Sequence, residues 1–179
     1  MSTHTGILIL LNSYALFDHF FLSPQARFNI SISTAPGVRT VLSNMPEILP
    51  SVWSSPDLVV HSFQTTPVMS TYLVAVVLGD MEHAEVNCSA EGGPPPPSAR
   101  DGGEDADASP RQGNVTLVRV WSTPRNKGQL QTALEVACAA LRVYSVSFGV
   151  PYVLPKLDLV GIPSFSAGAM ENWGIITFR

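Results

Sequence analysis

Residues 115–148 read VTLVRVWSTPRNKGQLQTALEVACAALRVYSVSF, and the spacing of their apolar side chains changes once. Over residues 115–121 apolar and polar residues alternate, which is typical of a strand with one buried face. Further on, apolar residues recur at steps of four and three, as on one face of a helix; they are Leu130, Leu134, Ala137, Leu141, Tyr144 and Phe148. The residues GVP at 149–151 end that helix. The stretch therefore predicts a strand followed by an amphipathic helix.

Other segments on both sides of this unit also predict strands. Alternation, turn signals or valine-rich apolar runs mark residues 28–33, 38–43, 57–63, 72–78, 156–162 and 173–178. The run at 72–78 is continuously apolar, so we expect that strand to be buried on both faces. The order predicts a mainly β N-terminal part, a partial β-sandwich or saddle domain, followed by the opening of an α+β domain.

Residues 88–114 break this pattern. They contain the run GGPPPP and then small and acidic residues, a composition that buries too little apolar surface to offset the entropy of ordering. We expect a disordered insert that lengthens a hairpin connection; a proline-rich ligand for another protein is the alternative. Just before it, residues 83–85 are expected to form a surface turn.

Composition limits the partners and the compartment. Ten basic and fourteen acidic residues give a net charge of −4 with no basic stripe, so no nucleic-acid partner is expected. The apolar N-terminal run is interrupted by Asn12, Asp18 and His19, so no membrane span is expected. No basic residue precedes Arg27, although a weak signal sequence is an open alternative. Two cysteines without a C-x-x-C spacing fit a reducing, cytoplasmic location, but they could also pair.

Residues 168–172, GAMEN, carry the most chemistry in the chain. Gly168 and Ala169 allow another main chain to approach closely, and an extended edge there could pair with a peptide. The carboxylate of Glu171 can hold a cation such as an α-ammonium group, and Asn172 could orient that carboxylate or bond the ligand. On these five residues alone, a β-turn with a solvated Glu171 is the simpler interpretation.

Four short motifs resemble motifs of the zinc-dependent aminopeptidases related to aminopeptidase N, and they follow one another along the chain in the same order as in that family. Residues 168–174, GAMENWG, resemble that family's signature, and PYVLPKLDL at 151–159 resembles its P-Y-x-L-P-K-x-D-L stretch. MSTYLVA at 69–75 and SNMP at 43–46 resemble a strand and a turn of the same family. The resemblance is nearest to the puromycin-sensitive, mostly cytosolic group. It implies that the α+β part opens a thermolysin-like catalytic domain.

The resemblance also implies roles for the loop. Glu171 would bind the free N-terminus of a peptide substrate, while the main chain at Gly168 and Ala169 would hold the substrate backbone. Met170 would line the pocket for the first side chain, or simply pack. Asn172 completes the substrate-binding set. In the parent enzyme a zinc ion would polarise the scissile carbonyl and activate a water.

The zinc motif of the family, H-E-x-x-H, does not occur in the sequence. None of the histidines has the required neighbours; they are His4, His19, His61 and His83. We therefore expect no metal ligands and no bound zinc in this chain, and no activity from it alone. Residues 1–27 match no family motif, so the expected divisions are 1–27, a partial β domain at 28–121, and a truncated catalytic domain at 122–179.

The sequence thus predicts a fragment of a zinc metallo-aminopeptidase that removes N-terminal residues from peptides. A truncated, non-catalytic paralogue that binds peptides or a partner is the alternative, and a scaffold without retained function is a third.

Overall fold

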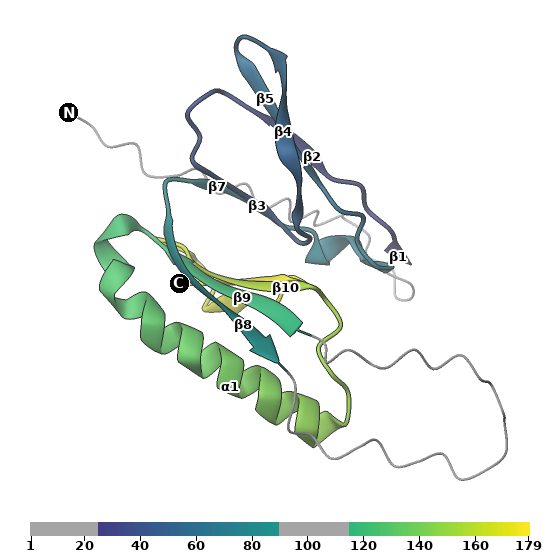
Figure 1. Ribbon diagram of the computed structural model, residues 1–179, viewed down its shortest axis with the longest axis vertical. Helices are drawn as coiled ribbons and strands as arrows, with labels where there is room; N and C mark the ends of the chain where they lie inside the picture. The colour runs from purple at the N-terminus through teal and green to yellow at the C-terminus, as the bar shows by residue number, and fades with distance from the viewer. Residues whose placement is uncertain (1–24, 90–114) are drawn as a thin grey trace, which may run out of the picture.

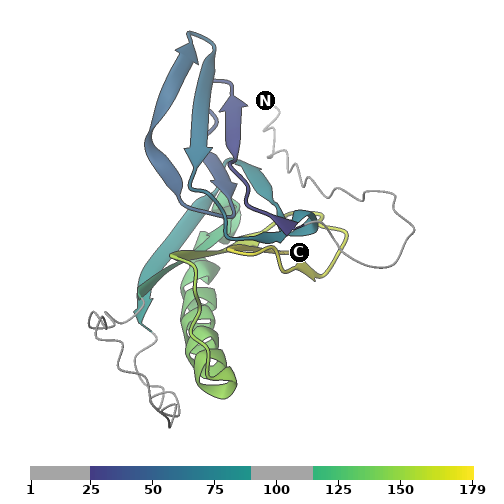
Figure 2. The ribbon, with the colours of Figure 1, turned by 90° about the vertical axis from the view of Figure 1, so that its right-hand side faces the viewer.

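The computed structural model describes residues 25–89 and 115–179. It has three layers, with a mixed β-sheet between a β-rich part on one side and a single helix on the other (Figure 1, Figure 2). The expected disordered insert lies outside the described residues, apart from Cys88 and Ser89, and so does the apolar N-terminal run.

The β-rich part consists of three small antiparallel sheets. One contains β2 (Ser31–Thr34), β5 (Leu58–Phe63) and β4 (Glu47–Ser55), in that order. The second pairs β3 (Thr40–Ser43) with β7 (Val76–Gly79). The third pairs β1 (Gln25–Ala26) with β6 (Met69–Ser70). The predicted fold class, a mainly β N-terminal part before a helix-containing part, is confirmed.

The central sheet has five strands in the order β11-β12-β10-β9-β8. The three inner strands, β9 (Val115–Ser122), β10 (Lys156–Gly161) and β12 (Ile175–Phe178), run parallel. The edge strands β8 (Glu82–Ser89) and β11 (Ala169–Met170) are antiparallel to their neighbours. Because β8 and β9 share this sheet with β10, the sheet crosses the boundary expected at residues 121–122, and that division stays a prediction.

Helix α1 (Leu130–Phe148) follows the short 3-10 helix η2 (Pro124–Gln129) and connects β9 to β10. It ends at Gly149, whose positive φ of 66° forms a left-handed cap that glycine adopts without steric cost. Its buried residues are Leu130, Leu134 and Ala137, so the predicted apolar spacing marks the face against the sheet. Leu141 is half-buried, while Tyr144 and Phe148 are exposed.

Strand alternation divides the side chains of the central sheet between two cores. The face toward α1 carries Val118, Val120 and Leu157. The opposite face packs Trp121, Val160, Ile162, Phe165 and Ile175 against Leu42, Ala75 and Val77 of the β-rich part. Both faces of the sheet are therefore covered over part of their area, as expected for its inner parallel strands.

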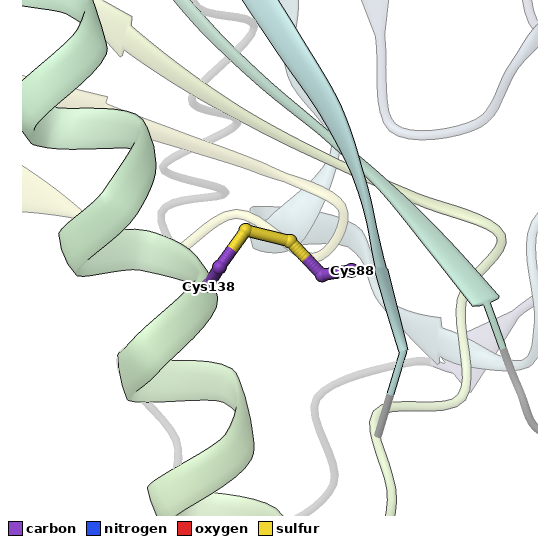
Figure 3. The surroundings of a disulfide bond; sticks show 2 residues. All are labelled: Cys88 and Cys138. Carbon is purple, nitrogen blue, oxygen red and sulfur yellow. A yellow bond between two sulfur atoms is a disulfide. The ribbon is translucent and has the colours of Figure 1, made fainter. Parts of the chain in front are cut away.

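A disulfide joins the helix to edge strand β8 (Figure 3). It links Cys88 to Cys138, which are 50 positions apart in sequence and have Cα atoms 5.8 Å apart. Ala84 and Cys88 alternate with exposed residues on β8 and pack against the α1 core. The sequence left open whether the two cysteines pair, and in the structure they are bonded to each other.

The structure differs from the sequence-based expectation in three local segments. The strand expected at 72–78 begins only at Val76, after the 3-10 helix η1 (Thr71–Leu73), because the Asn44 side chain bonds Leu73 O and Ala75 N in place of a strand ladder. The surface turn expected at 83–85 lies inside β8, whose polar residues face solvent because it is an edge strand. Strand β4 had no predicted counterpart.

Candidate functional site

The GAMEN loop lies at one edge of the central sheet. Ala169 and Met170 form β11, whose other edge is not paired by any strand among residues 25–89 and 115–179. Ala169 is in register with Phe178, and Arg179 N donates a hydrogen bond to Gly168 O at 3.1 Å. One edge of the loop is therefore fixed to β12, while the other can accept a peptide strand.

The five predicted residues divide into an exposed set and an inward set. Gly168, Ala169 and Glu171 are exposed, and a Cβ at Gly168 would meet nothing within 4 Å. Met170 is half-buried against the core between the sheet and the β-rich part. Asn172 is 1% exposed. The structure thus brings the carboxylate and the open main chain to one surface and turns the amide of Asn172 away from it.

Asn172 ties the loop to the β-rich part. Its Nδ2 donates to the main-chain oxygens of Leu73 at 3.3 Å and Tyr72 at 3.4 Å. Its Oδ1 is buried and has no hydrogen-bond partner within the described parts of the chain. In this conformation Asn172 anchors the loop rather than contacting Glu171.

Asn44, for which the sequence suggested no role, makes a second tie. It is 1% exposed, and its Nδ2 donates to both Leu73 O and Trp173 O at 2.7 Å. Its Oδ1 accepts from Ala75 N at 2.9 Å. The S-N-M-P motif was the only signal for this residue, since nothing in local sequence shows that a turn amide reaches a loop 129 positions away.

Lys156 and Asp158 form a buried ion pair beside the same loop. Lys156 Nζ donates to Asp158 Oδ2 at 2.6 Å, to Gly174 O at 2.9 Å and to Ser43 O. Asp158 also accepts from Arg119 at 2.6 and 2.9 Å and from the indole of Trp121 at 2.9 Å. The lysine and aspartate are 2% and 0% exposed, and the hydrogen bonds above give each polar side-chain atom of the pair a protein partner.

Burial acts unequally on these two charges. Burial lowers the pKa of Lys156 to about 8, with the Asp158 charge partly opposing it, so the ammonium persists at neutral pH. Burial alone would raise the pKa of Asp158, but the Lys156 charge and the Arg119 hydrogen bonds outweigh it and hold the pKa below its ordinary value. The difference arises because Asp158 faces two cations and an indole N–H, whereas Lys156 faces one anion.

A groove opens from the loop along the helix face of the sheet. Its volume is about 1380 Å³, and its lining includes Glu171, Asn172, Trp173 and Gly174. The rest is mainly apolar and is lined by α1 together with β10 and β12, including Ala133, Val136, Ala140, Tyr144, Leu159 and Ile176. Glu171 therefore lies where an apolar groove meets an open strand edge.

The residues that the structure describes do not fit a zinc site. Within 25–89 and 115–179 there is no group of three or more His, Cys, Asp or Glu side chains that could hold a metal ion. Near the loop, Asp158 is already engaged by Lys156, Arg119 and Trp121, which leaves Glu171 without a second free ligand beside it. Among the helices in the same ranges, none is both long and apolar enough to cross a bilayer.

Comparison with known proteins places this loop in a family. Residues 132–179, which include most of α1 and the whole loop, match the peptidase family M1 domain. Human aminopeptidase N is 35% identical over 171 residues, which are 93% of this chain and 15% of that protein. This chain is a relative of aminopeptidase N.

Plant proteins of the family are similar to the same degree. Aminopeptidase M1-A of Oryza sativa subsp. japonica is 37% identical over 155 residues, which cover 87% of this chain and 15% of that protein. Aminopeptidase M1 of Arabidopsis thaliana is 36% identical over the same extent. The expected relationship to M1 aminopeptidases is confirmed, and the chain spans 15% of the length of these relatives.

Proposed function

We propose that this chain is the substrate-recognition part of an M1 zinc aminopeptidase and that Glu171 binds the free N-terminus of peptides. The observation that carries the proposal is the position of Glu171: an exposed carboxylate directly after edge strand β11 that also lines an apolar groove. A peptide paired with β11 would bring its α-ammonium group to this carboxylate, where a charge-assisted hydrogen bond can form.

The residues of the loop would share this work. The main chain at Gly168 and Ala169 would pair with the substrate backbone, because both residues are exposed and the space beside Gly168 is open. Met170 packs into the core with part of its surface exposed, which suits the wall of a side-chain pocket. Zinc, when present in a full-length family member, would supply Lewis-acid activation of the scissile carbonyl and of a water.

Peptide binding is tested by calorimetric titration with Leu-Gly-Gly-Gly and with its N-acetylated form. We expect the wild-type chain to prefer the free amine at least tenfold, and Glu171→Gln to remove that preference. Glu135→Gln is the matched control, because Glu135 is an exposed carboxylate on α1 that accepts a hydrogen bond from Gln131. Equal affinity of the wild type for both peptides would exclude amine recognition.

The proposed lack of zinc and of activity needs a separate test. We expect the purified chain to contain no stoichiometric zinc by elemental analysis and to leave a leucyl-arylamide uncleaved. Hydrolysis that survives purification and is abolished by Glu171→Ala would overturn this part of the proposal.

The alternative is a non-catalytic paralogue that binds peptides or a partner. The enzyme fragment and the paralogue would have the same loop, so only the full gene product distinguishes them. A mature transcript that continues past codon 179 into H-E-x-x-H supports the enzyme fragment, whereas a stop codon there supports the paralogue.

Cytoplasmic location also stays a proposal. Disulfides persist mainly in oxidising compartments, so the Cys88–Cys138 bond favours the alternative that the chain is secreted. Thiol trapping in cells would show whether the two cysteines are reduced or paired.

A further inference from the structure

The position of the Glu171 carboxylate depends on the main chain of its loop. Among the described residues, the Glu171 side chain has no hydrogen-bond or ion-pair partner, and it is exposed. Side-chain contacts therefore do not hold it in place. Whatever fixes the backbone around Glu171 also fixes the point at which an ammonium group would be bound.

The backbone immediately after Glu171 is held by three successive ties. The side chain of Asn172 donates to the β-rich part, and Trp173 O accepts from Asn44. Gly174 O accepts from the main-chain N–H of Asp158 at 3.0 Å and from Lys156 at 2.9 Å. Lys156 also donates to Ser43 O, so one ammonium group joins the loop to the end of β3.

Holding the loop with Lys156 requires an ammonium group to be buried, which is unfavourable in free energy. An ammonium group offers three donors, and all three are used here, on Asp158, Gly174 O and Ser43 O. Burying an ion pair is often no more stabilising than burying apolar side chains of the same volume. What an apolar side chain cannot do is hold two carbonyl oxygens from distant segments at fixed positions.

We propose that Lys156 is a positioning residue for the amine-binding carboxylate of Glu171, acting through Gly174 O and Ser43 O. The inference rests on the proposed function and adds a residue to it that does not touch the ligand. Asp158, held by Arg119 and Trp121, accepts the third hydrogen bond of the ammonium and so helps to orient it.

The test compares Lys156→Met with the wild type at a temperature where circular dichroism shows both to be folded. We expect Lys156→Met to lower the preference for Leu-Gly-Gly-Gly over its acetylated form at least tenfold, and Lys156→Gln, which keeps an N–H donor, to lose less. Arg119→Met is the control, because it weakens the same ion cluster without removing a bond to the loop. It should reduce the melting temperature and keep the preference.

The outcomes separate the two proposals. A wild type without preference for the free amine overturns both. A wild type with the preference that Lys156→Met retains overturns the role of Lys156 alone. Should Lys156→Met not fold, the wild type gives the answer by NMR: the free-amine peptide should shift the Lys156 ammonium ¹⁵N resonance and the acetylated peptide should not, and an unmoved resonance during binding rejects the inference.

Discussion

Gly174 is the residue at which the GAMEN loop turns back into the sheet. Its φ is 83°, in the left-handed region, and a Cβ there would collide with the main-chain carbonyl of Asn44. The same approach brings Trp173 O within 2.7 Å of the Asn44 side chain. A glycine is therefore required both by the backbone conformation and by the close contact.

We predict that Gly174→Ala destabilises the chain by at least about 2 kcal/mol, because it adds backbone strain to a steric clash with main chain. Urea unfolding of the purified chain measures this. Gly128→Ala is the control, since a Cβ at Gly128 meets nothing within 4 Å and its φ is not positive. Similar unfolding midpoints for Gly174→Ala and the wild type would contradict the described turn.

The Lys156–Asp158 pair gives the chain a dependence on acid. Since the pKa of Asp158 is below 3.8 in the folded state, the unfolded chain binds more protons near that pH. The contribution of Asp158 is therefore complete above pH 3.8 and is lost as the pH falls through its folded pKa. We predict that Asp158→Asn shows a shallower loss of stability than the wild type as the pH falls below about 4.

The same substitution should also lower the free energy of unfolding at pH 7 by about 3 kcal/mol or more, because it leaves Lys156 buried without its anion. Urea unfolding between pH 7 and pH 3 tests both effects. Asp57→Asn, at an exposed position between β4 and β5, is the matched control. Parallel stability curves for Asp158→Asn and the wild type would show that the pair does not carry the acid dependence.

At the scale of elements, a disulfide bond joins helix α1 to edge strand β8. Cys88 and Cys138 close a loop of about 50 residues, for which the entropy of the unfolded chain predicts a stabilisation of up to about 4 kcal/mol. We predict that reductant lowers the melting temperature of the wild type, and that a Cys88→Ser/Cys138→Ser variant melts at that lower temperature with or without reductant. A wild type that is insensitive to reductant would contradict this.

The elements that local sequence predicted well are those whose apolar spacing follows their burial. Helix α1 matches because one face packs against a core, and strands β9, β10 and β12 match because their alternate side chains enter the two cores on either face of the sheet. Residues 71–75 do not match, because Asn44, far away in sequence, satisfies their main-chain groups. Strand β8 was missed because an edge strand keeps polar residues on its open side and shows a weak alternation.

At the scale of the whole molecule, the helix covers only part of its face of the sheet. α1 packs on β9 and β8, while the groove leaves Leu159 and Ile176 only half-covered. Val136 and Tyr144 of α1, 62% and 59% exposed, line the same groove. A continuous apolar surface of this kind is typical of a site that binds another polypeptide or promotes association.

We predict that the purified chain self-associates through this groove as its concentration rises, which sedimentation velocity would show. The double substitution Val136→Lys/Tyr144→Lys should reduce association strongly. Val143→Lys is the control, because Val143 is equally exposed on α1 but does not line the groove. A wild type that stays monomeric at high concentration would show that the groove does not drive association.

The sequence by itself determined helix α1, the strands whose apolar spacing follows their burial, the relationship to aminopeptidase N and the loop that carries Glu171, because spacing and short motifs are local properties. Only the tertiary structure decided what Lys156 and Asp158 do. In sequence they are the polar positions of an alternating strand, which ordinarily face solvent. The β-rich part covers that face of the sheet, so the two charges must satisfy each other and nearby carbonyl groups, and this places them behind the loop.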